Sequence, residues 1–243
     1  MFEDTLVEED IHPTYLSAGA TDTGRVRTSN QDAFVDAVAS CLWAVADGMG
    51  GHRDGDVASR MVCERLQGFR PGATLDDSID DVRRRMSQVN ARLYAAAIRP
   101  VNPVQSGSTV VILLSDRTSA AILWAGDSRV YRLRDGKLLQ LTSDHTWAAE
   151  LHPDDPHSED IDHAITRAVG GEEALLLDVR RERTRLGDRY LLCSDGLTRE
   201  LSHEKIAALL GKGDVVQSTQ ALIDATLAAG ARDNVTVVVV DAD

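Results

Sequence analysis

Three aspartates are the residues whose types and spacing could do chemistry. Asp47 opens a glycine-rich stretch, Asp195 is followed by Gly196, and Asp233 lies between an arginine and an asparagine. Each one borders an apolar, strand-like run: 42–46, 190–194 and 235–240. A strand that ends in a flexible turn can offer a metal both a carboxylate and a bare backbone carbonyl. The three aspartates therefore predict one oxygen-rich metal site at the ends of sheet strands.

The ligand types also indicate which metal and which reaction. Hard oxygen ligands without a His-rich or Cys-rich cluster favour Mg²⁺ or Mn²⁺ over zinc. Two such ions roughly 4 Å apart, bridged by a carboxylate such as Asp47, would activate a water and stabilise charge on a phosphoryl group during in-line displacement. Arg27 is suited to holding that phosphate, because a guanidinium binds phosphate oxygens through a bidentate fork.

Each of these residues has a plainer explanation when taken alone. An Asp-Gly pair such as 47–48 is commonly a turn, and Arg27 can be a surface charge. Asp127, between Gly126 and Ser128, can be a hairpin turn residue, and Asp195 can cap the helix that follows it. The combination of the residues, rather than any single one, favours a metal site.

The elements that must position these residues come in blocks. The apolar patterns predict strands at 15–21, 33–38, 41–46, 109–114, 120–125, 130–133, 174–182, 189–194 and 235–241. Helical periodicity predicts helices at 55–69, 76–98, 202–210 and 214–229. Because the strands come in blocks and the helices in pairs, we expect an α+β fold with helices outside antiparallel sheets. The strands between 109 and 133 should form an antiparallel meander, and residues 151–163 should form a flap.

Composition narrows the class of protein. The chain has 243 residues, of which 43% are hydrophobic, and this predicts a single domain over 15–243 after a flexible acidic extension at 1–14. The longest apolar runs are far shorter than the roughly 20 residues of a membrane helix. The first positive charge is Arg25, the opposite of a signal peptide, so we expect a cytoplasmic protein.

The net charge argues against two kinds of partner. At −13, and with no basic stripe to offset it, the chain should bind neither nucleic acid nor an anionic membrane. Its three cysteines lie far apart and suggest neither a disulfide framework nor a zinc knuckle.

Taken together, several segments closely resemble the metal-dependent protein phosphatase family, type 2C, in its bacterial branch. The resemblance covers nearly everything from residue 16 onward. The matching segments, in order, are 24–32, 47–52, 106–109, 125–129, 144–146, 164–170, 194–197 and 232–234. The resemblance implies a four-layer α/β/β/α sandwich with two central antiparallel sheets flanked by helix pairs.

The resemblance also implies roles for individual residues. Asp47 would bridge both metal ions, and the carbonyl of Gly48 would bind one of them. Asp195 and Asp233 would complete the other site, while Arg27 would hold the substrate phosphate. Two further carboxylates would assist: Asp32 through a metal-bound water, and Asp127 by helping to hold a third, weaker ion. Asn234 is expected to position Asp233 or its loop.

The sequence departs from the family pattern at two positions. Gln31 stands where many relatives have Glu, which removes a negative charge near the second metal. Met49 stands where eukaryotic relatives have a His proposed as general acid. The proton for the leaving group must then come from metal-bound water or from another residue. His52 is a candidate that we do not count among the catalytic residues.

The expected function is hydrolysis of phosphoserine and phosphothreonine in proteins by a metal-activated water at a binuclear Mn²⁺ or Mg²⁺ centre. The enzyme would oppose a bacterial Ser/Thr kinase, act on that kinase and its substrates, and work as a monomer. Two alternatives stay open. One is a catalytically silent member of the same fold that binds a phosphoprotein, and the other is a phosphatase for small phosphorylated metabolites.

Overall fold

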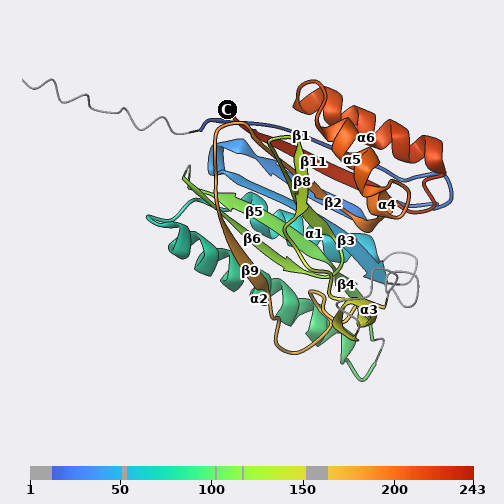
Figure 1. Cartoon of the computed structure of the whole chain (residues 1–243). Coiled ribbons are helices and arrows are strands. Elements are labelled where there is room, and N and C mark those ends of the chain that lie inside the picture. The colour runs from blue at the N-terminus through green and yellow to red at the C-terminus, as the bar shows by residue number, and fades with distance from the viewer. Residues whose placement is uncertain (1–12, 51–53, 102, 117, 152–163) are drawn as a thin grey trace, which may run out of the picture.

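Two antiparallel sheets lie face to face at the centre of the computed structural model, which describes residues 13–50, 54–101, 103–116, 118–151 and 164–243 (Figure 1). The first sheet has the order β1 (Tyr15–Asp22), β11 (Val235–Ala242), β10 (Asp188–Cys193), β7 (Arg129–Arg134) and β8 (Lys137–Gln140). The second has the order β2 (Asp32–Ala37), β3 (Leu42–Gly50), β5 (Val110–Ser115), β6 (Ser119–Ala125) and β9 (Asp178–Arg183). The short strand β4 (Ser106–Ser108) pairs with the end of β3.

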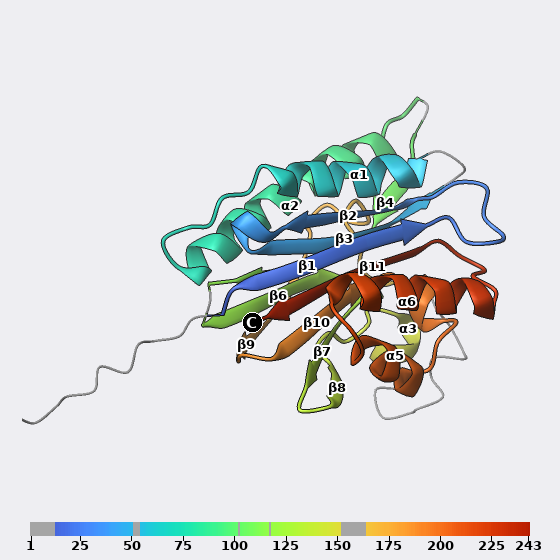
Figure 2. The same ribbon diagram turned by 90° about the horizontal axis from the view of Figure 1, so that it is seen from above.

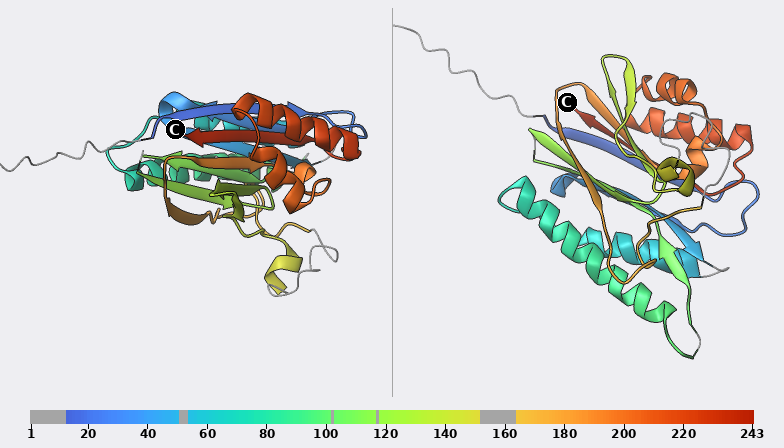
Figure 3. Two further views of the ribbon diagram at one scale, coloured as in Figure 1. Left: turned by 45° about the horizontal axis from the view of Figure 1, so that its top comes forward. Right: turned by 60° about the horizontal axis from the view of Figure 1, so that its bottom comes forward.

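Helix pairs cover the outer faces of both sheets, as the view from above shows (Figure 2). The second sheet is covered by α1 (Asp54–Gln67) and α2 (Leu75–Ala97). The first is covered by α4 (Asp195–Thr198), α5 (His203–Leu210) and α6 (Val215–Ala229). Figure 3 shows the same separation, with the orange and red helices on one side of the sheets and the cyan and green helices on the other. The four-layer α/β/β/α sandwich with flanking helix pairs is therefore confirmed.

Three apolar layers hold these elements together, and residues of one strand alternate between two of them. In β3, Trp43 and Val45 belong to the layer between the sheets, whereas Leu42, Ala44 and Ala46 belong to the layer beneath α1 and α2. Side chains of successive strand residues point to opposite faces. Because both faces of the sheet are covered, the strand reads as a continuous apolar run rather than as an alternating one.

The expected meander between residues 109 and 133 is wrong. Strands β5 and β6 pair with each other in the second sheet, but β7 pairs with β10 and β8 in the first. The turn at Gly126 and Asp127, where Gly126 has a φ of 111°, carries the chain from one sheet to the other. A glycine-containing turn has the same sequence signature whether the next strand pairs locally or crosses to another sheet. Asp127 consequently lies at a junction between the sheets.

The remaining differences concern short elements. The predicted strand 174–182 begins only at Asp178, and the strands β4 and β8 were not anticipated. A short helix that the periodicity did not predict, α3 (Trp147–Leu151), leads into the segment expected to form the flap. The expected flap lies almost wholly, and the expected N-terminal extension mostly, outside the described residues.

The helices begin where side chains satisfy free backbone N–H groups. Thr74 and Asp77 form a capping box at the start of α2, and Asp214 and Gln217 form another at the start of α6.

Within the described residues, no helix combines the length and the apolar character needed to cross a membrane.

Candidate metal centre

Asp47 is fixed at the point where β3 leaves the apolar core. Its backbone N–H donates to Thr109 Oγ1 at 3.1 Å, and its carbonyl accepts from the Thr109 N–H at 2.8 Å and from Ser108 Oγ at 3.1 Å. Across the β2–β3 ladder, Asp47 lies directly opposite Asp32. The two carboxylates that the sequence assigned to one site therefore start from neighbouring positions on adjacent strands.

Only glycine fits at position 48. The Gly48 N–H donates to the Gln31 carbonyl at 3.0 Å. A Cβ added to Gly48 would lie 2.0 Å from the Gly55 carbonyl oxygen and 2.7 Å from that of Gln31. The end of β3 is thus in close contact with both the start of α1 and the segment before β2. Metal binding by the Gly48 carbonyl stays a prediction.

Asp32 joins the two sheets. Its Oδ2 accepts hydrogen bonds from Ser194 Oγ at 2.8 Å and from Thr236 Oγ1 at 2.7 Å. Asp32 belongs to β2 of the second sheet, whereas Ser194 directly follows β10 and Thr236 lies on β11 of the first. Its Oδ1 is buried and has no hydrogen-bond partner. One oxygen of Asp32 therefore holds the sheets together, and the other is an acceptor that a cation or water could use.

Asp195 is the first residue of α4 rather than its cap. Ser194 takes the N-cap position, and the Asp195 carboxylate pairs instead with Arg199, at 2.5 Å between Oδ2 and Nη2. Arg199 also lies 4.0 Å from Asp127 and 3.8 Å from Asp233. Sequence reasoning missed this arginine, although its spacing of four residues from Asp195 puts both side chains on one helix face.

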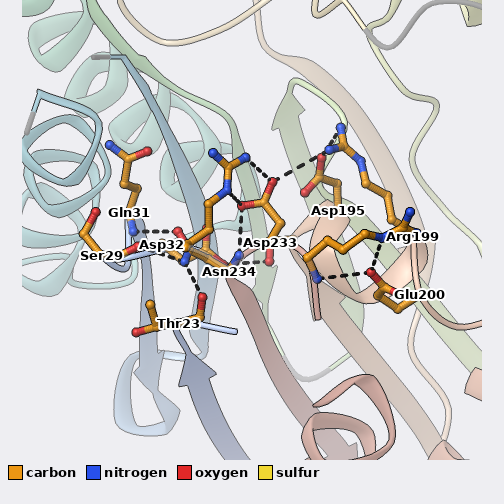
Figure 4. A network of polar contacts seen from close by, with 12 residues as sticks. Thr23, Ser29, Gln31, Asp32, Asp195, Arg199, Glu200, Asp233 and Asn234 are labelled. Atoms are coloured by element: carbon orange, nitrogen blue, oxygen red, sulfur yellow. Dashed lines mark hydrogen bonds and ion pairs between the residues drawn. The ribbon is translucent and has the colours of Figure 1, made fainter. Parts of the chain in front are cut away.

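Asp233 is held by an arginine and by the asparagine that follows it. Arg27 Nε donates to Asp233 Oδ1 at 2.8 Å and Arg27 Nη2 donates to Oδ2 at 2.7 Å. The Asn234 side chain donates to the carbonyls of Thr23 and Ser29 and accepts from the Gln31 N–H (Figure 4). Asn234 thus fastens the segment before β2 to the loop that carries Asp233, as the sequence predicted.

Asp127 is a buried residue and not a solvated turn residue. It is 5% exposed, and its Oδ1 is buried without a hydrogen-bond partner. His145 holds the turn through two hydrogen bonds. Its ring Nδ1 accepts from the Gly126 backbone N–H at 3.2 Å, and its backbone N–H donates to the Gly126 carbonyl at 3.0 Å. The carboxylate is therefore kept at the junction of the sheets by a rigid turn.

Asp47, Asp32 and Asp127 have raised pKa values, because they are buried and lie near other carboxylates. Burial, followed by the charges of Asp32, Asp195, Asp127 and Asp233, raises the pKa of Asp47 well above its usual value. Burial is also the main cause that raises the pKa of Asp32 to about 6 and that of Asp127 to about 7. A charged carboxylate is disfavoured both by desolvation and by like charges nearby. Additional positive charge at the cluster would consequently favour the ionised carboxylates.

The residues present fit divalent cations. Carboxylates with buried, unpaired oxygens at Asp32 and Asp127 match the ligands that Mg²⁺ and Mn²⁺ prefer. Among the described residues, no three Asp, Glu, His or Cys side chains already form a closed ligand set. Arg27 and Arg199 instead pair with Asp233 and Asp195. Cation binding by Asp233 would therefore require its bidentate pair with Arg27 to loosen, whereas the pair of Asp195 with Arg199 involves Oδ2 of that carboxylate.

The chain belongs to the protein phosphatase 2C family, whose model matches residues 22–234. It is 37% identical, over 92% of its length, to the serine/threonine protein phosphatase PstP of Mycobacterium tuberculosis, and it spans 44% of that protein. Among solved structures, it is similar to PppA, a key regulatory component of T6SS in Pseudomonas aeruginosa. That likeness has a TM-score of 0.88 and 37% identity, over 96% of this chain and 99% of PppA.

A second solved structure bears on the metal. The catalytic domain of PstP in complex with two manganese ions has a TM-score of 0.82 and is 36% identical, over 93% of this chain and 97% of that domain. This relative of the chain therefore holds two Mn²⁺ ions on the same fold.

The raised pKa of Asp127 makes stability depend on pH in a defined direction. The pKa of Asp127 is about 4 in the unfolded chain and about 7 in the folded, metal-free protein. Between these two pH values the folded protein binds more protons than the unfolded chain. The free energy of unfolding therefore decreases as pH rises through this range. Asn is neutral throughout. We expect Asp127→Asn to gain about 2–3 kcal/mol of unfolding free energy, relative to wild type, between pH 5 and pH 8. Urea denaturation with a chelator present measures this, and a difference that is constant with pH would contradict it.

Proposed function

We propose that this chain is a protein serine/threonine phosphatase that hydrolyses phosphoserine and phosphothreonine at a centre of two Mn²⁺ or Mg²⁺ ions. One observation carries the proposal. In a chain of the protein phosphatase 2C family, Asp32, Asp127, Asp195 and Asp233 come from four other segments and lie near enough to Asp47 for their charges, together with burial, to raise its pKa. Such a cluster is suited to multivalent cations.

In this proposal each residue has a separate task. Asp47 would bridge the ions, the Gly48 carbonyl would bind one, and Asp195 and Asp233 would bind the other. Asp32 supports the site through water with its free oxygen while its second oxygen holds the sheets together. When bound, the ions supply an activated water and stabilise charge on the phosphoryl group.

Arg27 holds the substrate phosphate. Its side chain is 56% exposed and currently forms a bidentate pair with Asp233. The same fork matches two oxygens of a phosphate. If Asp233 turns to a cation, the guanidinium is released and can bind an anionic substrate beside the ions.

The biological setting is part of the same proposal. Residues 15–243 form the catalytic unit, which acts in the cytoplasm as a monomer on phosphorylated proteins and opposes a Ser/Thr kinase. The names of PstP, as a serine/threonine protein phosphatase, and of PppA, as a regulatory component, support a signalling role. The silent phosphoprotein-binding member and the metabolite phosphatase are the alternatives that an assay must separate.

The first test is Mn²⁺-dependent phosphate release from a phosphothreonine peptide. We expect activity in wild type, its loss with a chelator, and a decrease of roughly a hundredfold or more in Asp195→Asn, because a ligand to the cation is removed. Asp80→Asn, on α2 with a side chain 78% exposed, is the matched control and should keep full activity. Binding of the phosphopeptide without turnover would support the silent alternative. Faster turnover of small phosphorylated metabolites would support the other.

A second test concerns Arg27. We expect Arg27→Ala to lower kcat/KM by roughly 10- to 100-fold, mainly through a higher KM, because a charged hydrogen bond to the phosphate is lost. Mn²⁺ affinity should stay the same or rise, because Asp233 loses its competing partner. Arg83→Ala, an arginine 50% exposed on α2, serves as the control. Weaker Mn²⁺ binding with an unchanged KM would show that Arg27 serves the metal site and not the substrate.

A further inference from the structure

Arg199 lies among three carboxylates of the site. Its Nη2 is 2.5 Å from Asp195 Oδ2 and 4.0 Å from Asp127 Oδ2, and its Nη1 is 3.8 Å from Asp233 Oδ2. Figure 4 shows the guanidinium beside Asp195, with a dashed line to Asp233. The three acids come from α4, the β6–β7 turn and the loop before β11. A single positive charge thus contacts three segments that meet at the centre.

The backbone sets the position of this arginine. Arg199 follows the single turn of α4, and its N–H donates to the Asp195 carbonyl at 2.9 Å. The acid precedes the base by four residues, which is the favourable order for such a pair on a helix. The next residue, Glu200, is fixed in turn by Arg232 at 2.9 Å. Arg199 is therefore held at the site by the helix.

The partners of Arg199 are more buried than those of an ordinary surface ion pair. The side chains of Asp127, Asp195 and Asp233 are 6%, 12% and 23% exposed. Exposed pairs contribute little because water screens both charges. Here the carboxylates are largely withdrawn from water, while Arg199 itself is 40% exposed. The guanidinium therefore neutralises charge that solvent reaches poorly.

We propose that Arg199 takes the place of a third metal ion between Asp127 and Asp195, so that the centre of this chain holds two divalent ions and one fixed guanidinium. This inference rests on the two-metal centre proposed above. It replaces the third, weaker ion that the resemblance implied at Asp127 with a residue of the chain itself.

A third ion and the Arg199 guanidinium are too close to occupy the space between Asp127 and Asp195 at the same time. A divalent ion binds carboxylate oxygens at about 2.0–2.6 Å. Nη2 of Arg199 is already 2.5 Å from the Asp195 oxygen and is shared with Asp127. An ion that used both carboxylates would have to displace the guanidinium.

The summed charge of the site also argues against a third divalent ion. Before substrate binds, two divalent ions together with Arg27 and Arg199 carry about six positive charges against five carboxylates, so the site is already slightly positive. A third divalent ion would add two positive charges beside a guanidinium that α4 holds in place. Like charges at such short range repel strongly in a partly buried site.

The experiment counts Mn²⁺ ions per chain, by native mass spectrometry and by titration calorimetry. Wild type should bind two ions, and Asp127→Asn should also bind two, because the guanidinium and not an ion occupies that position. Arg199→Ala should bind one additional, weaker ion, and the double variant Arg199→Ala with Asp127→Asn should lose it. Arg199→Lys keeps the positive charge and should bind two. The control is Arg84→Ala, an arginine paired with Asp81 on α2.

The outcomes separate this inference from the function on which it rests. Three ions in wild type, with one lost in Asp127→Asn, would overturn the inference and leave the phosphatase proposal intact. Two ions in Arg199→Ala would overturn it as well, since removal of the guanidinium would have opened no site. No Mn²⁺ binding by wild type would overturn the metal centre and the inference together. Each variant's unfolding transition shows whether the chain is folded during the count.

Discussion

Repulsion between carboxylates that the fold forces together is the interaction on which the rest of the site depends. Two unit charges 4 Å apart near a protein surface interact by about 4 kcal/mol, and burial increases the cost of each charge. Asp47 experiences the charges of Asp32, Asp127, Asp195 and Asp233 at once. A chain that only had to fold would gain by separating them, so the cluster is best understood as a site prepared for cations.

The sandwich supplies the rigidity that this arrangement needs. Three apolar layers lock the sheets and helices, and the acids are placed where strands leave those layers. Polar side chains then fasten the segments to one another. Asp32 accepts from hydroxyls of the opposite sheet, and Asn234 joins the loop of Asp233 to the segment before β2. Arginines at positions 27 and 199 neutralise part of the charge, each in a different way, because one lies in a loop and the other follows a helical turn.

Local patterns predicted helix pairs outside antiparallel sheets and three aspartates at strand ends, whereas the family resemblance implied the four-layer order. The local patterns could not predict which sheet a strand joins. The strand after Gly126 was assigned to a meander, yet β7 lies in the opposite sheet, since a turn signature contains no information about distant partners. The hydroxyl donors to Asp32 were missed for the same reason, being 162 and 204 residues away along the chain. Arg199 had a visible signal, its spacing of four from Asp195, but only the fold shows that Asp127 and Asp233 reach the same guanidinium.

The central claim is that these carboxylates gather to hold cations. Anomalous diffraction at the manganese edge, on crystals grown with Mn²⁺, tests it most directly. We expect two manganese peaks, both in contact with Asp47. Asp195 and Asp233 should contact one of the two ions, and Arg27 should be released from Asp233. Manganese bound elsewhere, or Asp233 still paired with Arg27 at saturating Mn²⁺, would contradict a cation site at this cluster.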